Sequence, residues 1–254
     1  MNYFDANTWV GRWPFAYCDA HTPRSLAAQL GRHGIRRALV SPLDAVFAPE
    51  PGPANRALLR ATRGLRGLEP VPVINPALAN WRETLADAAD DPRVRGVRLL
   101  PNYHGYRLGA GAMDELSDET AARKLRLIVQ MRLIDERHEF HAMTLKAVPV
   151  TELEQWLRRH PDRPVLASGL LRSELLLLAP KYPQLLADLS FAEWHDTIPH
   201  LLAKVPVRQL AFASHTPLLI TAAARAKLDT AEITEAKMRM IAAENLERFL
   251  ESLK

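Results

Sequence analysis

The sequence holds a single cysteine, Cys18, which excludes a disulfide within the chain and fits a reducing compartment. Long apolar runs are also missing. The most apolar stretch, residues 170–180, carries Arg172 and Glu174 and is too short to cross a bilayer. Residues 1–13 have neither a basic start nor an apolar stretch of signal-peptide length. We therefore expect a soluble cytoplasmic protein that has no membrane partner.

Dense basic runs are absent too, although the formal net charge is +4. The excess of arginine is scattered over separate helical stretches, as in Arg24, Arg32, Arg36, Arg60, Arg63 and Arg66. A nucleic-acid-binding surface usually needs clustered Lys and Arg, so we expect no nucleic-acid partner. The scattered positive charge fits a small anionic substrate instead.

What the sequence does contain is an alternation of short apolar runs with longer helical patterns. Most runs lack strict alternation of polar and apolar residues, which is typical of strands covered on both faces in a parallel sheet. The predicted strands are 3–7, 37–41, 70–75, 96–100, 126–132, 164–168, 185–190 and 209–214.

The intervening helices carry recognisable end signals. The segment 22–34 has Thr22 as the N-cap, Pro23 at the first helical position and Gly34 as the stop. Further helices are predicted at 55–65, 80–91, 118–125, 150–160, 172–182 and 193–205, and in two pieces over 230–253. Eight strands, each followed by a helix, predict one (β/α)8 TIM barrel over residues 1–254. The alternative is a doubly wound open sheet, but the first turn lacks the glycine-rich phosphate loop common in that fold.

Active sites of such barrels lie at the C-terminal ends of the strands and in the loops that follow. Polar residues at most of these ends predict a shared polar site, because burying them without partners is costly. The candidates for substrate binding are Asn7, Arg12, Arg98, Tyr103, Gln130, Arg137 and Ser168, and those for catalysis are His104, Arg132, Asp135 and His215.

The segment after the fifth strand is the richest in charge. It places Arg132, Asp135, Glu136, Arg137 and His141 close together in sequence. One interpretation is an arginine clamp for a substrate carboxylate, with Asp135 or Glu136 as acid/base or orienting group. The other is a cluster of ion pairs that fixes a loop.

Two histidines are candidates for moving a proton. His104 lies between Tyr103 and Tyr106 and is either a general acid beside a small pocket or a loop histidine bonded to backbone. His215 directly follows the last strand and precedes a Thr-Pro turn, which makes it the stronger candidate. Cys18 is interpreted as a packing residue.

Four segments resemble the amidohydrolase superfamily, in particular its amidohydrolase-2 group of barrel hydrolases and decarboxylases. They are FDANTWVGRWPF (4–15), RGVRLLPNYHGYRL (95–108), QLAFASHTPL (209–218) and AENLERFL (243–250). In their order they span nearly the whole chain. The resemblance implies a barrel enzyme with a metal centre at the strand ends.

The metal-ligand positions of that group hold other residues in this chain. Asn7 and Trp9 stand where the resemblance implies His-x-His, and His215 stands where it implies a catalytic Asp. Gln130 or Arg132 matches the histidine of the fifth strand, and Ser168 falls near that of the sixth. These residue types do not build a tight divalent site, so we expect no metal cofactor.

Three functions therefore remain open. The first is a metal-independent enzyme that hydrolyses, as lactonases do, or decarboxylates a small carboxylate-bearing substrate, with Arg98, Arg132 and Arg137 holding the anion. The second is a catalytically degenerate barrel that acts as a binding or partner subunit. The third is a metal-dependent hydrolase whose ligands are His104, His141 and His215. A homodimer is compatible with each of them.

Overall fold

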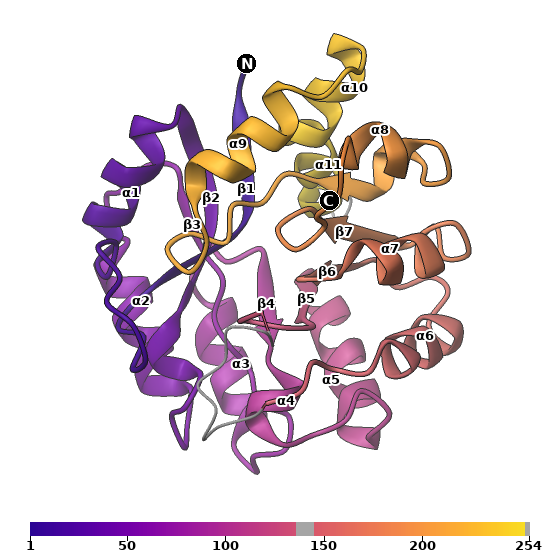
Figure 1. Ribbon diagram of the computed structural model, residues 1–254. Helices are drawn as coiled ribbons and strands as arrows, with labels where there is room; N and C mark the ends of the chain where they lie inside the picture. The colour runs from indigo at the N-terminus through magenta and orange to yellow at the C-terminus, as the bar shows by residue number, and fades with distance from the viewer. Residues whose placement is uncertain (136–144, 252–254) are drawn as a thin grey trace.

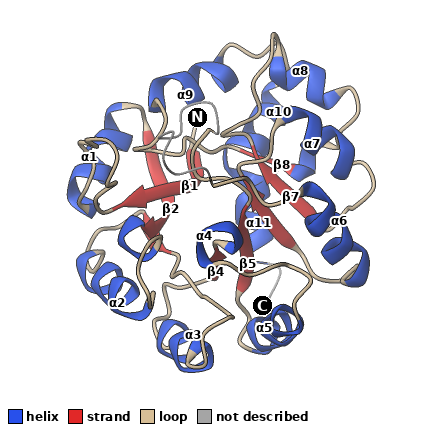
Figure 2. Ribbon diagram, turned by 60° about the horizontal axis from the view of Figure 1, so that its bottom comes forward, coloured by secondary structure: helices blue, strands red, loops and turns tan. Residues whose placement is uncertain are grey.

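The computed structural model describes residues 1–135 and 145–251, and these form a (β/α)8 barrel, as the alternation of strands and helices predicts. The strands within them are β1 (Tyr3–Val10), β2 (Ile35–Pro42), β3 (Leu68–Pro70), β4 (Gly96–Leu99), β5 (Arg126–Gln130), β6 (Val165–Ser168), β7 (Leu185–Asp188) and β8 (Leu210–Ala211). Figures 1 and 2 show the strands at the centre and the helices around them.

Neighbouring strands pair in parallel as β1-β2-β3 and as β4-β5-β6-β7-β8. Two further contacts join the two sheets into a barrel. Val73 bridges to Arg98 of β4, and the amide of Ala6 in β1 donates to the carbonyl of Phe212 at 3.0 Å. These contacts exclude the open doubly wound sheet.

The third strand ends earlier than predicted. Its ladder stops at Pro70, because Pro70 and Pro72 have no N–H to donate. The chain nevertheless continues along the barrel wall, since the amide of Val71 donates to the Val40 carbonyl and that of Ile74 to the Arg98 carbonyl.

The outer helices largely follow the prediction. They are α1 (Pro23–Arg32), α2 (Gly52–Ala61), α3 (Trp81–Ala89), α4 (Pro101–His104), α5 (Gly111–Ala122), α6 (Val150–Arg159), α7 (Arg172–Leu178), α8 (Thr197–Leu202), α9 (Thr221–Asp229), α10 (Glu235–Arg239) and α11 (Asn245–Glu251). Thr22 caps α1 in a capping box with Ser25. A π turn, Met240–Glu244, joins α10 to α11, and the short helix α4 and helix α9 were not predicted.

The barrel interior changes from apolar to polar along the strands. Its apolar layer includes Ile128, Leu166 and Leu186 on three adjacent strands. Side chains two residues apart share a face of a strand, so the next inward positions are Gln130, Ser168 and Asp188. This change places the polar side chains at the C-terminal ends of the strands, where the site is expected.

No helix of the described residues is long and apolar enough to span a membrane.

Candidate functional site

The centre of the barrel is occupied by the guanidinium of Arg98, which is completely buried. Its Nε donates to Ser41 Oγ at 2.9 Å, and its Nη1 donates to Asn7 Oδ1 at 2.7 Å and to Gln130 Oε1. The Trp9 ring packs against it, with Cζ 4.6 Å from the ring centroid. Burial lowers the pKa of Arg98 to about 9, so the group still carries its charge at neutral pH.

Asp188, at the end of β7, lies beside this guanidinium and is also fully buried. Its Oδ1 accepts hydrogen bonds from the amides of Gly169 and Ser190 and from Ser190 Oγ at 2.6 Å. Its Oδ2 accepts from Asn7 Nδ2 at 3.1 Å. Asn7 therefore links the Arg98 cation to the Asp188 carboxylate. We call Asn7, Arg98, Gln130 and Asp188 the floor cluster.

A second carboxylate, Asp5, lies near the floor cluster on β1. Its Oδ1 accepts from the amides of Asn7 and Ser214 at 3.1 and 3.0 Å. Its Oδ2 has no hydrogen-bond partner in the part of the chain that the structure describes. Complete burial outweighs these bonds and raises the pKa of Asp5 to about 7.

His215 follows β8 and is fully buried, near enough to Asp188 and Arg98 of the floor cluster to interact with their charges. Its Nε2 lies 2.7 Å from the Leu133 carbonyl, and a carbonyl can only accept, so Nε2 carries the ring proton. Burial lowers the pKa of His215 to about 4, so the ring is neutral near pH 7, and Nδ1 is an acceptor without a partner among the described residues. The Phe191 ring stands edge-on to it, with centroids 5.2 Å apart.

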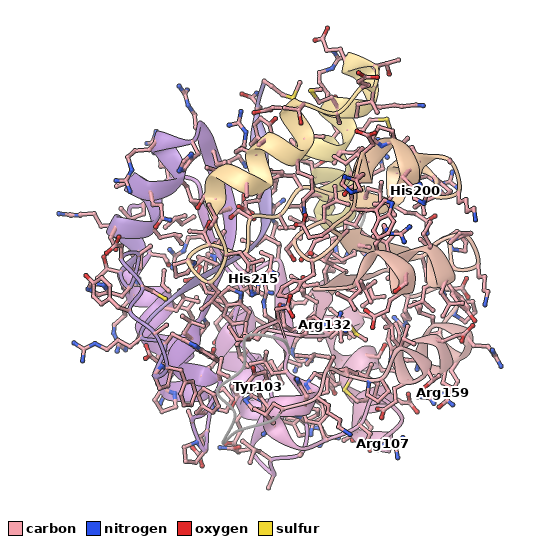
Figure 3. The ribbon with its side chains drawn as sticks, in the orientation of Figure 1. Tyr103, Arg107, Arg132, Arg159, His200 and His215 are labelled. Carbon is pink, nitrogen blue, oxygen red and sulfur yellow. The ribbon has the colours of Figure 1, made fainter. Side chains whose placement is uncertain are left out.

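Phe191 contacts His215 and also lines an open cavity of about 700 Å³ at the ends of β5 to β8, which we call the mouth pocket. Its lining residues are the polar Arg132, Asp135, Arg172, Ser173, Ser190 and Glu193 and the apolar Leu171, Phe191, Trp194 and Leu219. Figure 3 places Arg132 and His215 toward the middle of the barrel, and Arg107, Arg159 and His200 toward its periphery. An apolar wall with a few charged groups is suited to a small organic ion.

Arg132 lines this pocket, but its guanidinium is already engaged. It donates to both carboxylate oxygens of Glu174, at 2.7 and 2.9 Å, and to the Gly169 carbonyl at 2.6 Å. Its side chain is only 6% exposed. Of the two interpretations for this segment, the geometry of Arg132 matches the ion pair that fixes a loop.

Arg172, which sequence reasoning passed over, is the other arginine of the mouth pocket. Its Cζ lies 4.4 Å above the centroid of the Trp194 ring, and it has no ion-pair partner within residues 1–135 and 145–251. The carboxylate of Glu193, by contrast, pairs with Lys227 Nζ at 2.6 Å. The only hint in the sequence was a charged residue at the start of an apolar helix directly after a strand.

The structure does not gather every predicted residue at this pocket. Arg12 lines a separate cavity of about 570 Å³ formed by the exposed segment after β1. Tyr103 packs against Phe47 with ring centroids 5.5 Å apart. His104 Nε2 lies 3.1 Å from the Ala45 carbonyl, and burial lowers the pKa of this histidine. Arg137 lies outside the described residues.

The residues at the implied ligand positions do not fit a divalent metal. Asn7 and Gln130 direct their side-chain oxygens at the Arg98 guanidinium, a cation that would repel a metal ion at the same place. Among the described residues, no group of three or more His, Cys, Asp or Glu side chains could hold a metal. Trp9 and Ser168 add no strong ligand.

Comparisons with known proteins support the barrel. No family model and no curated protein matches the sequence. A solved structure of an amidohydrolase II protein is 16% identical, with a TM-score of 0.72, and the match covers 98% of this chain and 99% of that one. The likeness shows the fold, and at that level it agrees with the resemblance read from the sequence.

Two further structures combine this fold with different chemistry. A probable 2-pyrone-4,6-dicarboxylic acid hydrolase from Acinetobacter baumannii, with citric acid bound, is 15% identical, with a TM-score of 0.69 and coverage of 98% and 99%. A 5-carboxyvanillate decarboxylase from Novosphingobium aromaticivorans, complexed with manganese and 4-hydroxy-3-methoxy-5-nitrobenzoic acid, is 11% identical, with a TM-score of 0.73 and coverage of 98% and 96%.

Proposed function

We propose that this barrel is a metal-independent enzyme that hydrolyses or decarboxylates a small carboxylate-bearing substrate in the mouth pocket. The observation that carries the proposal is that one pocket is lined both by Arg172, a cation without an ion pair among the described residues, and by an acid/base candidate, Asp135.

Arg172 supplies the carboxylate-binding group. The guanidinium is half-buried, lies on the Trp194 ring and forms no ion pair in the described parts of the chain. A guanidinium binds a carboxylate through two parallel N–H···O bonds, which fixes the substrate in orientation as well as in place. Phe191 and Leu219 offer an apolar wall for the rest of the substrate.

Asp135 supplies the group that moves a proton. Hydrolysis of a lactone needs a base that takes a proton from the attacking water, and decarboxylation needs an acid that gives a proton to the carbon that loses CO₂. Asp135 lines the mouth pocket and meets a bound substrate directly. His215 does not line this pocket; it contacts Phe191 and fixes the loop after β5 through its bond to the Leu133 carbonyl. His215 therefore acts as a positioning residue.

Metal independence is supported by the floor cluster. The decarboxylase named above binds manganese, but this chain holds a guanidinium among its ligand positions. Hydrolysis then relies on the Asp135 carboxylate to activate water, without a Lewis acid. The comparison with a hydrolase that binds citric acid is compatible with an anionic substrate.

The experiment is a screen of lactones and small dicarboxylates with the wild-type protein and the variants Arg172→Met and Asp135→Asn. The proposal expects turnover of at least one compound, a raised KM in R172M and a kcat reduced about 10²-fold or more in D135N. Binding of a compound without turnover, equal in wild type and D135N, would instead support the degenerate binding subunit.

A further inference from the structure

We infer that Arg98 forms a second, internal site that binds one small oxyanion of the size of a carboxylate group. The inference rests on the contacts of Arg98 and not on the mouth pocket, so it stands or fails separately from the proposed function.

The first observation is that, within the described residues, the Arg98 cation has no carboxylate hydrogen-bonded directly to it. Its hydrogen bonds go to a hydroxyl and two amide oxygens, which are neutral groups. Asp188 and Asp5 act on it through space, and in the described residues neither accepts a hydrogen bond from it. A buried charge held only by neutral acceptors is costly, and a bound anion would offset that cost.

The second observation is that Nη2 of this guanidinium has no hydrogen-bond partner among residues 1–135 and 145–251. Both of its N–H bonds are therefore available in the fully buried centre of the barrel. Unsatisfied buried donors are rare in folded proteins and call for a specific explanation such as a bound ion or water.

The third observation is that two further buried donors, Trp9 Nε1 and Ser168 Oγ, have no hydrogen-bond partner among the described residues. Trp9 Nε1 belongs to the ring that packs against the guanidinium. Gln130 accepts a hydrogen bond from Arg98 Nη1 inside the barrel, and Ser168 pairs in register with Gln130 on the neighbouring strand. The Ser168 side chain therefore projects into the barrel as well, and its Oγ has no described partner. Arg98 Nη2, Trp9 Nε1 and Ser168 Oγ are thus three buried donors without a partner among the described residues, and the two or three oxygens of a small oxyanion accept from donors of this kind.

Formate is the smallest carboxylate and serves as the probe for this site. The Tm of the protein in formate is compared with its Tm in chloride at equal ionic strength. The inference expects formate to raise the Tm of the wild type by about 2–4 °C at concentrations well above its dissociation constant. Ser168→Ala removes a hydroxyl that has no partner in the described chain, so it leaves the Tm without formate nearly unchanged while weakening formate binding about tenfold. Trp9→Phe keeps an aromatic side chain but removes the N–H donor together with the five-membered part of the indole, and it weakens formate binding as well.

Two controls separate this site from other effects. Ser117→Ala removes another buried hydroxyl without a described partner, in helix α5, and leaves formate binding unchanged. Arg172→Met tests whether formate binds in the mouth pocket instead. Loss of the formate effect in R172M, together with unchanged binding in S168A and W9F, overturns the inference, and so does the absence of any formate effect on the wild type.

Discussion

Two hydrogen bonds join the guanidinium of Arg132 to the carboxylate of Glu174, with N···O distances of 2.7 and 2.9 Å. Arg132 follows β5, and Glu174 lies in the first turn of α7. A third bond, to the Gly169 carbonyl, ties both to the loop after β6. The pair therefore fixes the wall of the mouth pocket, and in our proposal the substrate carboxylate binds to Arg172.

Breaking this pair is expected to destabilise the fold. Arg132→Met leaves the Glu174 carboxylate without its main partner, and Glu174→Gln does the same to the guanidinium, so each costs about 2–3 kcal/mol of unfolding free energy. The double variant loses less than the sum, because neither charge is then left unpaired. Urea denaturation measures all four proteins, and strictly additive losses would count against the pair.

Arg172→Met is expected to weaken substrate binding and to leave the stability of the fold nearly unchanged. It removes the proposed substrate-binding cation but breaks no ion pair in the described structure, so KM rises about tenfold or more while stability changes by less than about 0.5 kcal/mol. Arg158→Met is the matched control, because that side chain is 72% exposed on α6, away from the pocket. An equal rise of KM in both variants would contradict the assignment.

Gly169 is expected to tolerate no side chain. Its φ is +81°, and a Cβ there would lie 2.6 Å from the Arg132 carbonyl oxygen. Gly169→Ala should therefore cost about 2–4 kcal/mol and move the wall that holds Arg132. Gly111→Ala in helix α5 meets no atom within 4 Å and should be neutral or slightly stabilising. The Tm of the two variants compares a glycine whose Cβ position is occupied by neighbouring backbone with one whose Cβ position is empty.

The lowered pKa of His215 should make the folded protein less stable in acid. Its folded pKa of about 4 lies below the ordinary value of 6.5, so the unfolded chain binds more protons between these values. Stability from this group is complete above pH 6.5 and is lost as the pH falls toward 4. His215→Gln should lose less stability than the wild type over that range, as measured by urea denaturation. An identical acid dependence would show that His215 does not titrate in this way.

Asp5 should change the pH dependence of stability in the direction opposite to His215. Its folded pKa of about 7 lies above the ordinary 3.8, so the folded state binds more protons, and the stability it contributes is lost as the pH rises from 3.8 to 7. Asp5→Asn should remove that loss and flatten the curve toward neutral pH. A mutant curve that falls as steeply as the wild-type curve would contradict the raised pKa.

Much of the fold is predictable because it depends on local patterns. Apolar runs mark the strands, and Thr22 with Pro23 marks the start of α1. The inward direction of Gln130 also follows from its place at a strand end. The partner of Arg132 does not, because Glu174 lies 42 residues away and is brought near only by the closure of the barrel. For Arg172 the sequence holds only the weak signal of a charge at the start of an apolar helix, because its lack of an ion pair among the described residues is a tertiary property.

The central claim is that this barrel binds and converts an organic anion without a metal ion. The most direct measurement is the turnover of the best substrate from the screen after exhaustive dialysis against EDTA, with metal content determined in the same sample. The account predicts unchanged turnover in metal-free protein and no gain on adding manganese. Turnover that disappears on chelation and returns with one equivalent of manganese or zinc would contradict it.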